Sequence, residues 1–142
     1  MFVPVHLFQL SEYQFSSAGF IKEQLARLEQ SANTMVDSGL RMATLKMIRL
    51  VASHDPSKSS VILEEGVYEI YRASWVVYAN FVGVRETYSS REVEKARGII
   101  TQVYEVALRK TSWISDQKVA SQKLVLARTD LKKKADFFKE TK

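Results

Sequence analysis

Two rows of large apolar residues run side by side through residues 63–88, and both advance in steps of three and four, as one side of an α-helix requires. The first row consists of Leu63, Val67, Ile70, Ser74, Val77, Phe81, Val84 and Tyr88, and the second of Tyr68, Tyr71, Trp75, Tyr78 and Val82. Each residue of the second row lies about 100° around the helix from a residue of the first, so the apolar arc approaches half of the circumference. Such a helix is either the centre of its own bundle or a contact surface for another molecule.

Capping residues predict where the helices begin. A Ser, Thr or Asp at the cap accepts hydrogen bonds from the first free amides, and proline loses no hydrogen bond at the first helical position. The start signals are Ser11 with Gln14, Asp55-Pro56, Ser89 with Glu92, and Ser115-Asp116. We therefore expect helices over residues 12–53, 57–87, 90–112 and 115–139, with the last two separate or continuous.

The first of these segments has a strict three-four apolar alternation, and three of its members are small enough to let another helix approach closely. This row consists of Ala18, Ile21, Leu25, Leu28, Ala32, Met35, Gly39 and Met42. A glycine inside a helix costs about 1 kcal/mol relative to alanine. We expect that close packing offsets this cost at Gly39, or that the helix bends there.

The chain of 142 residues has the length of one domain. We expect a single all-α domain over 1–142, a bundle of three to four long antiparallel amphipathic helices that is able to form oligomers, with an apolar leader segment at 1–10. No alternating pattern typical of strands is present. The expected core residues are Leu25, Leu28, Met35, Val67, Ile70, Val77, Phe81, Ile100 and Val103.

Positive charge is concentrated in the last quarter of the chain. Residues 109–142 carry ten basic and four acidic residues, a net charge of +6, whereas the other 108 residues have a net charge of −1. This segment is either a solvated helix with a frayed basic tail at 132–142 or a contact for phosphates or an acidic partner. The candidate anion or nucleic-acid contacts are Lys118, Lys123, Arg128, Lys132, Lys133 and Lys134.

Residues for enzymatic chemistry are scarce. The chain has no cysteine and only two histidines, His6 and His54, and it lacks the carboxylate–histidine spacings of helical metal sites and the glycine-rich loops of nucleotide sites. Glu64, Glu65 and Glu69 lie in the first turns of a helix, where the helix dipole favours negative charge. We expect no catalytic residue, cofactor or metal, and hence no enzymatic activity.

Two segments resemble known helical proteins. The stretch from Trp75 to Phe81, followed by Lys95-Ala96-Arg97, resembles one half-a-TPR repeat over about thirty residues; that family consists of RNA-processing scaffolds built from consecutive repeats. The long first helix, the Asp55-Pro56 break and the segments 93–96 and 103–105 resemble phasins, which coat polyester granules. These resemblances imply a scaffold or a coat on a hydrophobic surface.

The leading functional hypothesis is an assembly or scaffolding protein that binds a protein partner or a second copy through Tyr68, Tyr71, Trp75, Tyr78 and Val82. Tyrosine and tryptophan are typical of interface hot spots. A nucleic-acid-associated bundle that uses the basic segment and a phasin-like coat remain the alternatives. No apolar run reaches the length of a membrane span, and the leader lacks a basic n-region, so we expect a soluble, intracellular and cytoplasmic protein.

Overall fold

A computed structural model describes residues 19–54, 60–116 and 122–140, with side chains at 19–54, 64–111 and 122–140. These residues form five α-helices, namely α2 (Gly19–Ala32), α3 (Ser38–Ser53), α4 (Ser60–Val84), α5 (Ser90–Asp116) and α6 (Gln122–Lys139). No strand occurs in these ranges, so the all-α class is confirmed. The predicted three to four long helices are corrected to five within the described residues.

Residues 12–53 do not form one helix. The part that the structure describes divides at residues 33–37, where α2 ends and the chain turns back into α3. Asp37 is the N-cap of α3, and its Oδ1 accepts a hydrogen bond from the Leu40 amide at 2.8 Å. Arg41 donates to the Met35 carbonyl at 2.7 Å and so ties the turn to the new helix. A local cap therefore overrides the continuous apolar spacing.

The apolar spacing predicted one continuous helix because the turn between α2 and α3 also contributes a buried apolar side chain. Met35 lies in the turn but is only 7% exposed, so the three-four pattern continues through a segment that is not helical. Beyond the turn the buried side of α3 changes phase: Leu40 and Ala43 are buried, whereas Met42 is 59% exposed. The predicted apolar row therefore does not continue on one buried side as far as Gly39 and Met42, both of which are exposed at the start of α3.

The other boundaries agree more closely with the sequence. α4 ends at Val84, α5 begins at Ser90, and α6 ends at Lys139. α5 continues to Asp116 through the weakly apolar residues 110–112, so Ser115-Asp116 is the end of a helix and not the start of one. The predicted start at residue 12 and residues 57–59 lie outside the described ranges.

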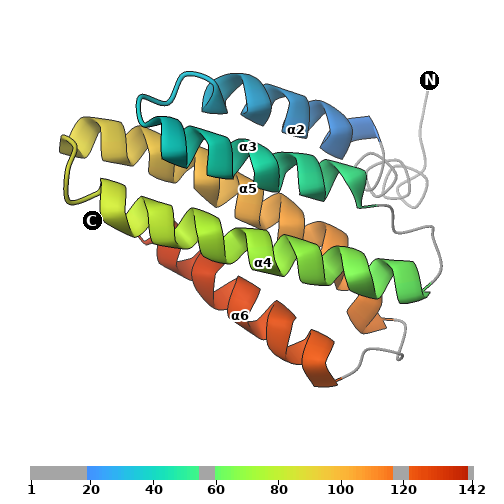
Figure 1. Ribbon diagram of the computed structural model, residues 1–142. Coiled ribbons are helices and arrows are strands. Elements are labelled where there is room, and N and C mark those ends of the chain that lie inside the picture. The colour runs from blue at the N-terminus through green and yellow to red at the C-terminus, as the bar shows by residue number, and fades with distance from the viewer. Residues whose placement is uncertain (1–18, 55–59, 117–121, 141–142) are drawn as a thin grey trace, which may run out of the picture.

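Successive helices run antiparallel, and α5 is the central helix of the bundle. It lies behind α3 and α4 in Figure 1 and contacts α2, α3, α4 and α6. α4 lies between α3 and α6 and also contacts α5. The sequence predicted that the helix over 57–87 has the widest apolar surface. In the structure this surface packs against α3, α5 and α6.

The core joins residues from all five helices. All nine of the core residues expected from the sequence are buried, which confirms that assignment. The largest fully buried side chains are Tyr104, Phe81, Phe138, Leu40, Met47, Ile48, Ile70, Ile100, Leu131, Val51 and Val67. Three aromatic rings meet where α4, α5 and α6 converge: Phe138 lies 5.1 Å from Phe81 and 4.8 Å from Tyr104, between ring centroids.

Polar contacts fasten α6 to α5. Thr101 donates to the Phe138 carbonyl at 2.9 Å, Arg97 donates to the Glu140 carbonyl, and Arg128 donates to the Thr111 hydroxyl at 3.2 Å. Residues 132–139 are helical, and this part of the expected basic tail carries the fully buried Phe138. It is thus a packed helix and not a frayed one, because Phe138 is fully buried against the rings of Phe81 on α4 and Tyr104 on α5.

We predict opposite effects for the same substitution at two helical glycines. A Cβ at Gly66 would lie 2.5 Å from His54 Nδ1, whereas a Cβ at Gly98 would meet nothing within 4 Å. Gly66→Ala should lower the free energy of unfolding by about 1–2 kcal/mol through overpacking, and Gly98→Ala should raise it by about 0.5–1 kcal/mol through helix propensity. Urea unfolding followed by circular dichroism measures both. If the two substitutions changed the free energy of unfolding equally, the His54 ring would be able to move aside at little cost.

Candidate functional site

The two apolar rows of α4 have different neighbours in the structure. Along the first row, Val67, Ile70, Ser74, Val77 and Phe81 are buried in the bundle. Along the second row, Tyr68, Tyr71, Tyr78 and Val82 are half-buried and Trp75 is 46% exposed. The side chain of Leu63 lies outside the described ranges.

Helix α6 covers much of the second row. The Lys123 ammonium lies 4.6 Å from the centre of the Tyr68 ring, and the Tyr78 ring packs edge-on against Phe137 with centroids 5.0 Å apart. The doubled apolar arc of α4 is therefore used largely within the monomer, with α3 and α5 on one side and α6 on the other. Only part of the predicted interface remains accessible.

A buried lysine lies beneath Trp75. Lys134 is only 5% exposed, forms an ion pair with Asp130 one turn earlier on α6, and places its ammonium 3.4 Å from the centre of the indole ring. Tyr78 meets the indole edge-on at 6.2 Å between centroids. These contacts hold the indole in one orientation, because a cation over an aromatic face is attracted by the ring quadrupole.

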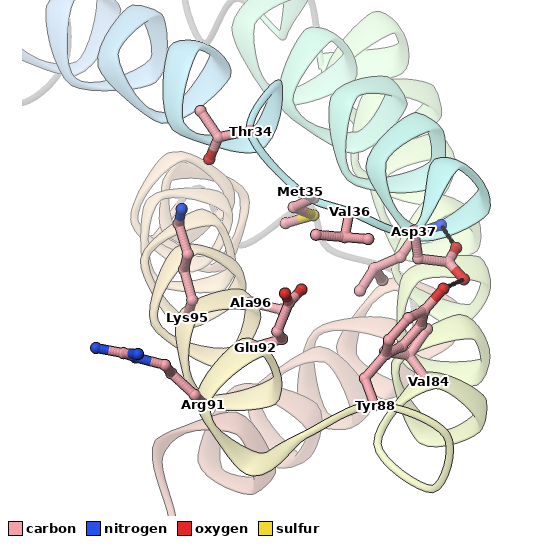
Figure 2. Close-up of a pocket in the computed structure, with 11 residues that line it drawn as sticks. Thr34, Met35, Val36, Asp37, Val84, Tyr88, Arg91, Glu92, Lys95 and Ala96 are labelled. Carbon is pink, nitrogen blue, oxygen red and sulfur yellow. Dashed lines mark hydrogen bonds between the residues drawn. The ribbon is translucent and has the colours of Figure 1, made fainter.

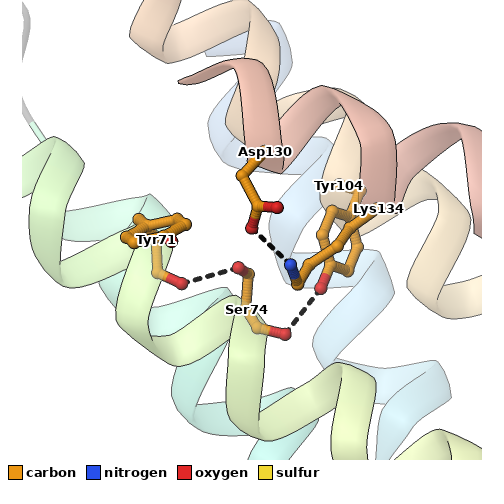
Figure 3. A network of polar contacts seen from close by, with 5 residues as sticks. All are labelled: Tyr71, Ser74, Tyr104, Asp130 and Lys134. Atoms are coloured by element: carbon orange, nitrogen blue, oxygen red, sulfur yellow. Dashed lines mark hydrogen bonds and ion pairs between the residues drawn. The ribbon is translucent and has the colours of Figure 1, made fainter. Parts of the chain in front are cut away.

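The same region contains a satisfied polar network (Figure 3). Tyr104 donates to the Ser74 carbonyl at 2.6 Å, and the Ser74 hydroxyl donates to the Tyr71 carbonyl at 2.6 Å. Burial, the largest influence, raises the pKa of Tyr104 well above its usual range. The phenol therefore stays protonated and serves as a donor that joins α5 to α4.

The accessible remainder is a surface that we name the α4 outer face. Its members share one side of the helix and of the turn that continues it, and they are exposed apart from the half-buried Val82. They are Arg72, Trp75, Val76, Ala79, Val82, Gly83 and Glu86. Trp75 and Val76 are each 46% exposed, and Gly83 has open space around its missing side chain.

A groove between α3 and α4 borders this face. It encloses about 390 Å³ and is lined by Lys46 and Leu50 from α3 and by Glu69, Arg72, Ala73 and Val76 from α4. Met42, one turn before Lys46 on α3, is 59% exposed. The groove extends the α4 outer face toward α3 with apolar residues (Leu50, Ala73, Val76) and charged ones (Lys46, Glu69, Arg72).

The structure separates the candidate anion contacts. Lys132 and Lys133 are exposed, whereas Lys134 points inward to Asp130 and Trp75. Arg128 is half-buried and donates to Thr111, and Lys118 lies outside the described ranges. Because a buried and paired ammonium is not presented to a phosphate, Lys134 does not contribute to a basic surface with the exposed Lys123, Lys132 and Lys133.

A second cavity lies where the α2–α3 turn meets the α4–α5 turn (Figure 2). It encloses about 380 Å³ above an apolar floor that includes Met35, Leu40 and Val84. Asp37 is already engaged there, since it caps α3 and accepts a hydrogen bond from the Tyr88 hydroxyl at 3.4 Å. The Glu92 carboxylate points into the cavity, and Arg91 extends away from it.

Neither cavity shows a catalytic constellation among its described residues. The Thr34 hydroxyl beside the second cavity donates to the Ser31 carbonyl at 2.6 Å. Within the described residues no group of three histidine or acidic side chains could hold a metal ion. None of the described helices is long and apolar enough to cross a membrane.

Sequence reasoning found Trp75 and Val82 but missed Val76, Ala79 and Gly83. These three residues lie between the two apolar rows and the polar side of α4, where small or isolated apolar residues give little signal. The run of small and apolar residues at spacings of three and four from Arg72 could have indicated the face.

No family model matches this chain, and no curated protein and no solved structure matches it either.

Proposed function

We propose that this chain is a non-enzymatic assembly protein that binds another protein surface through the α4 outer face. The observation that carries the proposal is the exposure of Trp75 and Val76, each 46%, at adjacent positions on the helix that is otherwise the most apolar of the bundle. Full burial of such side chains contributes on the order of 1.5–3 kcal/mol each. A partner that covers them gains this free energy, which the monomer leaves unused.

The rigidity of Trp75 supports the same proposal. A side chain that is already ordered loses little conformational entropy on binding, and this lowers the free-energy cost of association. The Lys134 ammonium and the Tyr78 ring order the indole from within the monomer. Trp75 thus has the properties of an interface anchor, a large aromatic residue fixed at the surface.

Another exposed apolar pair helps to show why α4 is favoured. Val125 and Leu126 on α6 are 50% and 62% exposed, but the outer side of α6 continues through Thr129, Lys132 and Lys133. The α4 outer face instead continues through Ala79, Val82 and Gly83. A continuous apolar patch with a charged border is typical of protein interfaces, whereas single apolar residues among lysines are ordinary surface.

Site-specific photocrosslinking tests this proposal. A photoreactive phenylalanine analogue replaces Val76 in one variant and Leu126 in a control, in the cells that produce the protein. We expect a discrete crosslinked species from position 76, identified by mass spectrometry, and none above background from position 126. The species from position 76 should disappear when Trp75→Ala is added while circular dichroism shows intact helices. If position 76 gives no crosslink, or gives the same products as position 126, the proposal is wrong.

A further inference from the structure

We infer that the partner of the α4 outer face is a second copy of this chain, with the two α4 helices antiparallel and a twofold axis passing near Ala79. This inference rests on the proposed function and names its partner. It follows from the order of large, small and charged residues along α4 and the turn that continues it. In an antiparallel pair centred on residue 79, positions whose numbers add to about 158 face each other.

The apolar residues match in size under this register. Trp75 faces Val82 of the second copy, Val76 faces Gly83 of the second copy, and Ala79 faces its own equivalent. From the helical period of 100° per residue, Trp75 and Val82 lie on the side of α4 toward α6, while Val76 and Gly83 lie on the side toward α3. The twofold axis places the α6 side of one α4 helix opposite the α6 side of the other, and the α3 side opposite the α3 side. The Trp75–Val82 and Val76–Gly83 pairs therefore each occur twice in the dimer.

Small residues at the centre allow the two helices to approach closely. Ala79 and Gly83 are exposed, and nothing lies within 4 Å of the position that a Gly83 side chain would occupy. The second copy's Val76 can therefore enter this space. Close packing within the monomer explains the glycine at position 66, where the His54 ring occupies the space of a side chain, but it does not explain the glycine at position 83.

The charges at the two ends of the face are complementary to each other. Arg72 lies at one end and Glu86 at the other, and their numbers also add to 158, so each would face its opposite across the twofold axis. Both are exposed, and neither belongs to an ion pair within the described part of the chain. A parallel arrangement would place like charges together, which fixes the direction as antiparallel.

The face has the length of a helix-pair interface. Residues 72–84, the helical part of the face, span about 18 Å at 1.5 Å per residue, and Glu86 follows in the turn after α4. Stable interfaces bury at least about 1,000 Å² in total, so residues that flank α4 must contribute. Met42 on α3 is 59% exposed one turn before Lys46, which lines the groove together with Val76, and under this register it would face α3 of the second copy.

Single cysteines test the register, because the natural chain has none. Ala79→Cys should form a covalent dimer on mild oxidation or with a short bismaleimide, whereas Leu126→Cys, on the outer side of α6, should remain a monomer under the same conditions. Sedimentation of the unmodified protein should show a concentration-dependent dimer. A protein that stays monomeric up to millimolar concentration and gives no Ala79→Cys crosslink would overturn the inference.

Charge reversal provides a second and independent test. Arg72→Glu alone and Glu86→Arg alone should each weaken dimerisation about tenfold or more, since every reversal creates two like-charge contacts across the axis. The double variant Arg72→Glu with Glu86→Arg should restore dimerisation to near the original value. Lys133→Glu added to Glu86→Arg is the control, because it restores the net charge without restoring the contact. If this control restores dimerisation, or if the double variant does not, the proposed register is wrong.

The two proposals can fail separately. If photocrosslinking at position 76 traps only a different protein and sedimentation shows a monomer, the inference of a second copy fails while the proposed assembly function stands. If position 76 traps this chain itself, both stand. If it traps nothing, the proposed function fails together with the inference.

Discussion

Phe138→Ala is expected to lower the free energy of unfolding by about 3–5 kcal/mol, the usual cost of removing a fully buried phenylalanine ring. Phe138 is completely buried and contacts the rings of Phe81, Tyr104, Tyr78 and Phe137 from α4, α5 and α6. The resulting cavity would lie where three helices converge, so the neighbouring rings cannot easily close it. Urea unfolding followed by circular dichroism measures the loss.

The matched control is Leu126→Ala on the same helix, whose side chain is 62% exposed. Its expected effect lies within about 0.5 kcal/mol. The sequence left open a solvated helix with a frayed basic tail at 132–142. If Phe138→Ala were as mild as Leu126→Ala, the frayed tail would be the better description and the packed position of α6 would be wrong.

The second large effect concerns the buried ion pair of α6. Asp130→Ala is expected to lower the free energy of unfolding by about 3 kcal/mol, because it leaves the Lys134 ammonium buried without its carboxylate partner. Lys134→Met should cost less than about 1 kcal/mol. The methionine keeps the apolar packing beneath Trp75, and the remaining Asp130 side chain, which is 31% exposed, can be solvated.

The asymmetry between these two variants is the informative result. Chemical denaturation measures both, and Asp136→Ala, an exposed acidic residue on the same helix, controls for the loss of a negative charge. Equal losses from Asp130→Ala and Lys134→Met would mean that the pair itself, and not the isolated buried charge, sets the stability. A loss from Asp136→Ala as large as that from Asp130→Ala would point to net charge instead.

The fold class and much of the core were predictable from the sequence. Periodicity of 3.6 residues marks helices wherever one side is buried, and it identified Val67, Ile70, Val77, Ile100 and Val103 correctly. The start of α5 at Ser90 followed from the capping residues Ser89 and Glu92, and the Glu92 amide donates to the Ser89 hydroxyl at 3.4 Å. These signals are local, since they depend on residues three or four apart.

The break between α2 and α3 was not predictable from periodicity. Met35 is buried from a turn, so the apolar spacing passes through the break without interruption. Asp37 followed by Gly39 was the available signal, because an aspartate cap competes with a continuous helix. Which of the two prevails depends on whether the second helix finds a partner, and α3 finds both α4 and α5.

The sequence by itself determined that this chain is helical, that α4 has two apolar rows and that the positive charge lies at the end. Only the tertiary structure decided how that surface is used. Docking of α6 covers part of Tyr78, buries Lys134 and leaves Trp75 and Val76 exposed. The physical reason is that periodicity shows which side of a helix avoids water, whereas the neighbour that covers it is chosen by contacts between residues far apart in the chain.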